Sequence, residues 1–401
     1  MKILVITPIY PAAYNPIGTT PLMHYFTKKW VEQGHKVCVL DFCSKYPQPM
    51  VWVARLFKKI LVSKLGIVVP LMQPWDYDEI QDGVEIHHYG LNKVIPHGRF
   101  GKKSITKAIA IAEGFIKEDK PNMIIGHWAN PSLDIISQLR AKYEIPCSVV
   151  FHETAEDIIH YYGLESQSMI KKIDVLGFRS KPLKENFEAV FGKHKSFMAY
   201  SGVPENFLKE AKLVPEKTFE TIGNFIFVGS LMERKHPAEI LPALKNVYSD
   251  NKKYKMVYVG EGKESEKINT FCKQNNAETN VLLTGRIPRD EIMEYLKKSE
   301  VFIMISEAEV FGLVYLEAMA FGCITIASKG EGFDGIIEDG VNGFLCEAGN
   351  SEELAFIITK IKSLPKEEIC HISNRAKQTA QKFSDSLVAE NYLNNIINLT
   401  K

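Results

Sequence analysis

Two carboxylates separated by seven residues are the strongest candidates for chemistry in this 401-residue chain. Glu309 lies in a predicted loop after the apolar run 301–305, and Glu317 lies within a helix predicted to begin near Gly312. The amide groups at the start of such a helix favour an anion or a sugar hydroxyl. A carboxylate can accept hydrogen bonds from two neighbouring hydroxyls, so we expect the glutamates to bind different parts of one extended ligand. The alternative is that each glutamate only stabilises the helix dipole.

The residues around both glutamates resemble the retaining glycosyltransferases of family 4. Phe-Gly-Leu follows Glu309 closely, and residues 317–328 (EAMAFGCITIAS) and 337–345 (IEDGVNGFL) are similar to two further runs of that family. The resemblance implies an α/β fold called GT-B, with two doubly wound Rossmann-like domains facing across a cleft. It also implies a retaining enzyme that transfers a hexose from a nucleoside diphosphate sugar to a hydroxyl acceptor.

The same resemblance extends to the binding of the donor. Residues 227–235 are similar to a segment whose arginine and lysine bind the pyrophosphate; Lys235 matches the lysine, whereas Ser230 replaces the arginine. A cation is needed there because the departing nucleoside diphosphate develops negative charge. Arg234 compensates for the replacement only if its side chain points the same way as that of Lys235. The donor-binding residues that the resemblance implies are Gly18, Thr19, Ser230, Arg234, Lys235, Arg286, Ile287, Val310, Phe311, Gly312, Leu313 and Glu317.

The catalytic residues that the resemblance implies are Glu309, Lys235 and His152. His152 follows the apolar run 148–151 and would position the hexose; the alternative is a structural histidine, and His127 is a similar candidate. By analogy with retaining glycosidases, Glu309 would attack the anomeric carbon. The resemblance instead implies front-face substitution, in which the leaving phosphate helps to deprotonate the acceptor. Neither a metal nor another cofactor is then required.

Two short motifs suggest metal binding without further support. Asp76-Tyr77-Asp78 reads as a DxD signature, in which carboxylates and a diphosphate share a divalent cation. It lies far in the sequence from the predicted donor domain. His87-His88 has no additional ligand at metal-binding spacing. We therefore expect metal-independent transfer.

Short apolar runs alternate with longer helical patterns along the chain, which predicts parallel sheets covered by helices on both faces. The pattern restarts after about residue 215, and the polar stretch 210–220 is the predicted linker. We predict an acceptor-binding domain over residues 1–212 and a donor-binding domain over residues 213–382. By resemblance, residues 383–401 form a helix that returns to the first domain.

The net charge of +1 argues against a nucleic-acid-binding protein, although residues 1–72 carry nine basic and two acidic side chains. Residues 50–72 combine apolar and basic side chains without an acid, which predicts contact with an anionic membrane. The alternative is a packed helix with a basic outer face. We expect the protein to be cytoplasmic, because its cysteines are widely spaced and the sequence shows neither a signal-peptide pattern nor a long apolar run. If the membrane contact forms, the protein would lie at the inner face of the plasma membrane.

We therefore expect a hexosyltransferase of bacterial surface polysaccharide synthesis, acting in capsule, exopolysaccharide or lipopolysaccharide assembly. Its partners would be a UDP- or GDP-sugar and a glycan or lipid-linked acceptor. The alternative is a non-catalytic protein of the same fold that binds nucleotide sugars or regulates an enzyme, which only Ser230 favours. An epimerase of this fold is less well supported, because glutamates at this spacing resemble those of the transferases.

Overall fold

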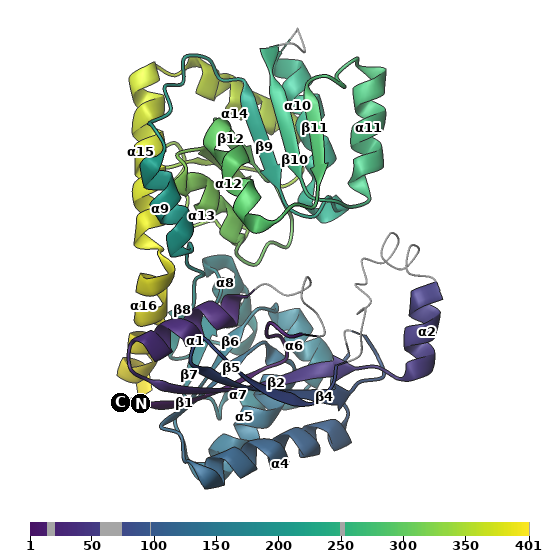
Figure 1. Ribbon diagram of the computed structural model, residues 1–401, viewed down its shortest axis with the longest axis vertical. Coiled ribbons are helices and arrows are strands. Elements are labelled where there is room, and N and C mark those ends of the chain that lie inside the picture. Colours follow the sequence, from purple (N-terminus) through teal and green to yellow (C-terminus); the bar gives the residue numbers. More distant parts are fainter. Residues whose placement is uncertain (14–20, 57–73, 97, 249–252, 401) are drawn as a thin grey trace. The chain divides into compact units, whose positions relative to one another are not determined.

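The computed structural model describes residues 1–13, 21–56, 74–96, 98–248 and 253–400, and it divides into two compact units (Figure 1). The first unit comprises Met1–Arg179, Leu183–Tyr200 and Asp385–Lys401; the second comprises Ser180–Pro182 and Ser201–Ser384. The main division along the chain thus follows Tyr200, whereas the predicted boundary lies after residue 212.

The described part of the first unit is built on an eight-stranded sheet with the order β3-β4-β2-β1-β5-β6-β7-β8. All neighbouring strands are parallel except β3, which runs antiparallel to β4 at the edge. The strands are β1 Lys2–Thr7, β2 Lys36–Lys45, β3 Tyr77–Gln81, β4 Val84–Asn92, β5 Met123–His127, β6 Cys147–Phe151, β7 Val175–Phe178 and β8 Ser196–Met198.

Helices cover both faces of this sheet, which explains why its central strands are apolar throughout. Every residue of β5, β6 and β7 is buried, as expected for parallel strands between two helical layers. In Figure 1, α1 and α16 lie together on one side of the sheet, and α4 and α5 lie on the other. The described helices of this unit are α1 Leu22–Glu32, α2 Gln48–Leu56, α4 Lys102–Glu118, α5 Ala129–Tyr143, α6 Ala155–Tyr162, α7 Glu165–Ile170, α8 Lys181–Phe191 and α16 Asp385–Thr400.

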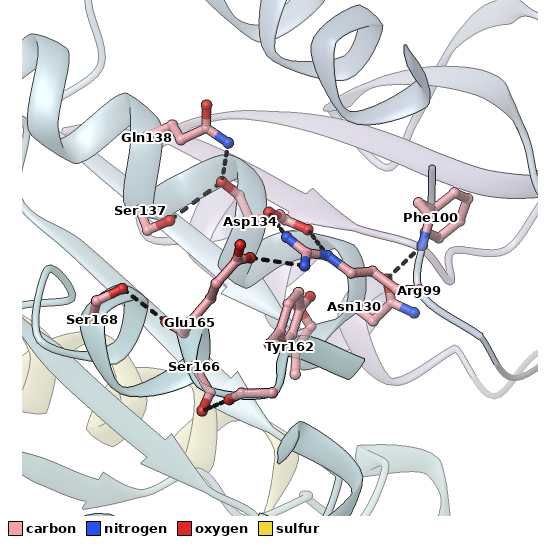
Figure 2. A network of polar contacts seen from close by, with 12 residues as sticks. Arg99, Phe100, Asn130, Asp134, Ser137, Gln138, Tyr162, Glu165, Ser166 and Ser168 are labelled. Carbon is pink, nitrogen blue, oxygen red and sulfur yellow. Dashed lines mark hydrogen bonds and ion pairs between the residues drawn. The ribbon is translucent and has the colours of Figure 1, made fainter. Parts of the chain in front are cut away.

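A polar network around Arg99 fixes the start of α5, the helix that follows the predicted site residue His127 (Figure 2). The Arg99 guanidinium donates two hydrogen bonds to Asp134 of 2.8 and 2.9 Å and a third to Glu165 of 2.9 Å. It also lies over the Tyr162 ring, 4.7 Å from the centroid. The Tyr162 hydroxyl donates to the Ala129 carbonyl at 2.7 Å. The turn between β5 and α5 is therefore held from the neighbouring helices α6 and α7.

The last helix, α16, completes the core of the first unit. Tyr392 packs against Phe26 and Trp30 of α1, with ring centroids 5.1 and 5.2 Å apart. The Trp30 indole donates a hydrogen bond of 2.9 Å to the Ala389 carbonyl. Aromatic burial of this kind is a large stabilising contribution, so the first unit depends on residues from both ends of the chain.

The described part of the second unit is built on a six-stranded parallel sheet with the order β11-β10-β9-β12-β13-β14. Its strands are β9 Asn224–Val228, β10 Lys255–Val259, β11 Val281–Gly285, β12 Val301–Ile303, β13 Ile324–Ser328 and β14 Phe344–Cys346. Its helices are α9 Glu205–Leu213, α10 Ile240–Val247, α11 Glu264–Gln274, α12 Arg289–Lys298, α13 Leu313–Ala320, α14 Ser351–Ser363 and α15 Lys366–Lys382, with short 3₁₀ helices η1 Glu233–Lys235 and η2 Pro237–Glu239. The predicted fold class of two doubly wound α/β units is confirmed.

Among the described residues, no helix combines the length and the apolar character needed to span a bilayer.

Candidate active site

The most distinctive feature of the second unit is a carboxylate held beside two cations at the carboxyl ends of neighbouring strands. Glu309 lies in the loop between β12 and α13, and its side chain is 13% exposed. The Lys235 Nζ lies 3.3 Å from the Glu309 Oε2, and an Arg234 guanidinium nitrogen lies 4.0 Å from the same oxygen. That oxygen is buried and makes no hydrogen bond among the described residues. A buried acceptor with unused capacity is costly unless a ligand supplies the donor.

The topology of the sheet explains why Glu309 meets Lys235 and Arg234, which lie 74 and 75 positions earlier in the chain. Strands β9 and β12 are parallel neighbours, so the loops that follow them emerge at the same edge. Arg234 donates hydrogen bonds of 3.2 and 3.3 Å to the carbonyls of Glu307 and Ala308. The side chains of Arg234 and Lys235 therefore point toward the same loop. This is the condition under which Arg234 can take the place of the arginine that is replaced by Ser230.

A second loop supports Glu309 from behind. The Gly332 amide donates to the Glu309 carbonyl at 2.7 Å, and the Glu309 amide donates to the Glu331 carboxylate at 2.8 Å. A Cβ on Gly332 would lie 2.3–2.5 Å from backbone atoms of Glu309, Val310 and Phe311. Burial raises the pKa of Glu331, and the neighbouring Glu309 charge adds to this, although the amide hydrogen bonds oppose it. Because a Cβ at position 332 would overlap the backbone of the Glu309 loop, only glycine fits there.

Helix α13 begins directly after this loop, with Gly312 in the left-handed region at φ 78°. No side chain caps its first turn. Phe311 is buried, whereas Gly312 and Leu313 are partly exposed. The Tyr315 hydroxyl donates to the Met304 carbonyl at 2.7 Å and ties the helix to the end of β12. The amides of the first turn are therefore placed beside Glu309, and they can bind an anion or a hydroxyl oxygen.

Glu317 has a partner that the sequence did not predict. It is 4% exposed and forms an ion pair with Arg289, the first residue of α12. The Arg289 guanidinium also lies over the Phe207 ring, 5.4 Å from the centroid. No local sequence pattern pairs Glu317 with Arg289, which lies 28 positions earlier on a different helix. The only local sign is that Arg289 lies two residues after Ile287, which is one of the predicted donor-binding residues.

The loops after β9, β10 and β11 approach one another closely and carry three more predicted residues. The Gly260 amide donates to the Gly285 carbonyl at 2.9 Å, and a Cβ on Gly260 would lie 1.9 Å from the Gly229 carbonyl oxygen. Ser230 and Arg286, which follow Gly229 and Gly285, are exposed, and Ile287 is partly exposed. Glycine at these strand ends allows the backbones of the three loops to come into contact. Ser230, Arg286 and Ile287 therefore lie on adjacent loops of the second unit.

His152 belongs to the first unit, where it is partly buried and contacts the fully buried His127. The His127 Nδ1 lies 3.0 Å from the His152 Nε2, and the His127 Nε2 lies 2.9 Å from the Tyr392 hydroxyl. Trp128 stacks on His152 with centroids 4.1 Å apart. Burial, and next the Arg179 charge, hold the pKa of both imidazoles well below the usual range. His152 is therefore neutral near pH 7 and suited to hydrogen bonding; its role toward a hexose stays a prediction.

Two predicted features lie wholly or partly outside the described residues. Gly18 and Thr19 lie outside them, as does most of the predicted membrane segment 50–72. The part of that segment within α2 exposes Trp52, Val53 and Leu56, which are 70%, 54% and 81% accessible.

Comparison with known proteins finds a family match within the second unit. Residues 209–382 match the family model described as glycosyl transferases group 1. The chain is also 26% identical, over 71% of its length, to an uncharacterised glycosyltransferase of Methanocaldococcus jannaschii, of which it covers 77%.

A second relative and a solved structure extend the comparison. A poly(glycerol-phosphate) α-glucosyltransferase of Bacillus subtilis is 26% identical over 56% of this chain, which covers 33% of that relative. The structure of Anabaena HepE in complex with UDP superposes with a TM-score of 0.69, at 16% identity, over 99% of this chain and 100% of that one. The likeness confirms the predicted GT-B fold.

Proposed function

We propose that the protein is a retaining glycosyltransferase of family 4 that transfers a hexose from a nucleoside diphosphate sugar to a hydroxyl acceptor. The observation that carries this proposal is the buried, hydrogen-bond-free Glu309 Oε2 beside Lys235 and Arg234. A sugar hydroxyl would supply the missing donor, and a pyrophosphate would bind the two cations. The match to a glycosyltransferase family model over residues 209–382 supports this assignment.

The proposed donor is a UDP- or GDP-sugar. Lys235 and Arg234 would bind the pyrophosphate, because charge-assisted hydrogen bonds to phosphate are stronger than neutral ones. Arg289 orients Glu317, whose carboxylate would accept hydrogen bonds from the ribose hydroxyls. Arg286 and Ile287 would lie near the base. The similarity in fold to HepE, which was solved with UDP, supports a nucleotide as part of the donor.

The proposed transfer proceeds on one face of the sugar without a metal ion. Glu309 and the amides of residues 310–313 would hold the hexose, while Lys235 and Arg234 would stabilise the charge that develops on the leaving phosphate. The leaving phosphate would accept the proton of the acceptor hydroxyl as the new glycosidic bond forms. Catalysis would then rest on positioning and charge stabilisation.

The proposed acceptor is a hydroxyl of a surface polysaccharide or of its lipid-linked precursor, presented at an anionic membrane. The name of the Bacillus subtilis relative specifies an anionic polymer as its acceptor. The exposed Trp52, Val53 and Leu56 on α2, together with the basic side chains of residues 55–64, suit insertion at a membrane surface.

The first experiment is a thermal-shift screen of the purified protein against UDP, GDP, ADP and their sugars. A ligand at about 100 times its Kd adds about 2.7 kcal/mol of stability. The best donor is then incubated with water or alcohol acceptors, and the anomeric configuration of the product is assigned by NMR. Retention is the expected outcome. Nucleotide binding without hydrolysis or transfer would favour the non-catalytic alternative, and an inverted product would exclude the proposed mechanism.

Membrane contact is tested separately with sedimented vesicles at low salt. We expect binding to vesicles that contain anionic lipid and weaker binding after Trp52→Ala and Leu56→Ala. Exposed Leu213 of α9 provides the matched control, Leu213→Ala. Absence of binding to anionic vesicles would exclude this part of the proposal.

A further inference from the structure

Three side chains that bind borderline metal ions gather at one place in the first unit. Cys38 of β2 and Glu85 and His87 of β4 bring a sulfur, a carboxylate oxygen and a ring nitrogen within 4.8 Å of one another. Cys38 and Glu85 are direct partners in the register of these parallel strands. Residues two apart on a strand point to the same face, so Glu85 and His87 lie on the same side of the sheet.

The two ring nitrogens of His87 both face carboxylates. The Nε2 lies 3.0 Å from a Glu85 oxygen, and the Nδ1 lies 2.7 Å from an Asp78 oxygen. A neutral imidazole has one N–H and can donate to only one of them. Two states satisfy this geometry: a protonated imidazolium between two acids, or a neutral ring that binds a cation through Nε2 and donates from Nδ1 to Asp78. In the second state, Asp78 fixes the tautomer, as carboxylates commonly do for metal-bound histidines.

The neighbouring His88 provides an internal comparison. Its ring nitrogens lie 2.8 Å from Asp41 and 2.9 Å from Glu79. Among the described residues, no cysteine joins His88 in a group with metal-binding geometry. Cys38 therefore distinguishes the His87 cluster from a histidine that is simply held between two acids. A thiol does not stabilise an imidazolium, but it is a strong ligand of a borderline cation.

The cluster is accessible and lies near the amino ends of its two strands. A cavity lined in part by Cys38, Glu85 and Phe115 opens beside it, which gives a hydrated ion a route to the ligands. Cys38 and Glu85 lie near the amino ends of β2 and β4. Ligands of open α/β sheets bind at the carboxyl ends of parallel strands, so this group lies toward the opposite edge of the same sheet.

We propose that Cys38, Glu85 and His87 bind a divalent cation of the zinc class and thereby tie β2 to β4. Mixed sulfur, nitrogen and oxygen ligands favour Zn²⁺ over Mg²⁺ or Ca²⁺. Bonds of about 2.0–2.3 Å require the three ligand atoms to draw together, and water or a nearby acid completes the coordination. The Cys38 thiol gives up its proton to solvent as the metal–sulfur bond forms.

Cobalt titration of the metal-free full-length protein tests this inference, because a thiolate bound to Co²⁺ gives a charge-transfer absorption that carboxylates and imidazoles do not. We expect about one Co²⁺ per chain with this absorption, and displacement by Zn²⁺. The substitutions Cys38→Ser and Glu85→Gln should each weaken Co²⁺ binding at least tenfold, and Cys38→Ser should also abolish the absorption. Glu85 is 43% exposed, so Glu85→Gln keeps the test available if Cys38→Ser fails to fold.

Cys370 of α15 is the matched control, since it is also partly buried and free. Cys370→Ser should leave both the affinity and the absorption unchanged. No charge-transfer absorption in the folded wild-type protein, or an equal absorption in folded Cys38→Ser, would overturn the proposal and leave His87 as an imidazolium between two acids.

Discussion

At the scale of single residues, the sequence predicts the carboxylates better than their partners. The spacing of Glu309 and Glu317 marks both as candidates, and the segment ending at Lys235 marks the cation. The convergence of Arg234 and Lys235 on Glu309, and the pairing of Glu317 with Arg289, depend on side-chain directions across two strand ends. Such directions follow from tertiary structure, so no local pattern specifies them.

The charge of Glu309 is predicted to be essential for transfer. Glu309→Gln keeps the size of the side chain but removes the charge beside Lys235, and it presents an amide where a sugar hydroxyl needs a strong acceptor. We expect kcat to fall about 100- to 1,000-fold, the range for loss of one preorganised electrostatic contact. The control is Glu307→Gln, on the same loop but 60% exposed, which should retain activity within a few-fold. Equal losses in the two variants would contradict a specific role for Glu309.

Glu153 is predicted to make stability depend on pH. Its carboxylate accepts hydrogen bonds from the amides of Ala129 and His152, yet burial raises its pKa to about 7. The folded-state pKa exceeds the ordinary value near 4.5, so between pH 4.5 and 7 the carboxyl keeps its proton in the folded state but loses it in the unfolded state. The stabilising contribution of Glu153 is therefore complete below about pH 4.5 and is lost as the pH rises through 7. The free energy of unfolding falls by about 3 kcal/mol in all.

Urea unfolding followed by circular dichroism checks this prediction. Glu153→Gln keeps an oxygen for both amides, so its free energy of unfolding should rise by about 3 kcal/mol relative to the wild type between pH 4.5 and 7.5. Glu185→Gln, on the exposed surface of α8, should show no such change. Parallel pH profiles for Glu153→Gln and the wild type would exclude a raised pKa.

At the scale of elements, apolar runs predict the strands because parallel strands between helices are apolar on both faces. The runs at 148–151 and 324–327 correspond to β6 and β13, which are entirely buried. Close approaches between loops are harder to predict. Gly332 lies against the loop of Glu309, and the cluster of Cys38, Glu85 and His87 depends on the pairing of β2 with β4. Strand order and register bring such residues together, and neither is written in a local sequence pattern.

The contact between the loop at Gly332 and the loop at Glu309 is predicted to be needed for donor binding. In Gly332→Ala, the new Cβ would overlap backbone atoms that lie 2.3–2.5 Å away, so the loop of Glu309 must move. We expect lower thermal stability and at least a tenfold weaker affinity for the donor, measured by calorimetry. Gly114→Ala in the middle of α4 meets nothing within 4 Å and should instead raise stability by about 1 kcal/mol. Unchanged donor affinity in Gly332→Ala would show that the loop tolerates displacement.

At the scale of the whole molecule, the alternation of apolar runs and helical patterns predicts two doubly wound units, and the structure has them. The structure divides after Tyr200 rather than after residue 212, because α9 (Glu205–Leu213) belongs to the second unit. The first unit also includes Asp385–Lys401, so its core depends on both ends of the chain.

Removing the aromatic side chain of Tyr392 is predicted to destabilise the first unit. Tyr392→Ala would leave a cavity among Phe26, Trp30 and His127 and should lower the free energy of unfolding by about 3–5 kcal/mol. Tyr392→Phe keeps the packing and loses only the hydrogen bond to His127, so its cost should be about 1 kcal/mol. Chemical unfolding monitored by tryptophan fluorescence distinguishes them, because Trp30 contacts the substituted ring. Similar costs for the two variants would show that the hydrogen bond, rather than the packing, is decisive.

The central claim is that the second unit binds a nucleoside diphosphate through Lys235. Calorimetric titration of UDP and GDP into the wild type, Lys235→Ala and Lys255→Ala tests it most directly, since Lys255 is exposed at the start of β10. We predict that one of these nucleotides binds, that Lys235→Ala weakens its affinity at least tenfold, and that Lys255→Ala leaves it unchanged. Equal affinities in all three proteins, or no binding of either nucleotide to the folded wild type, would contradict the claim.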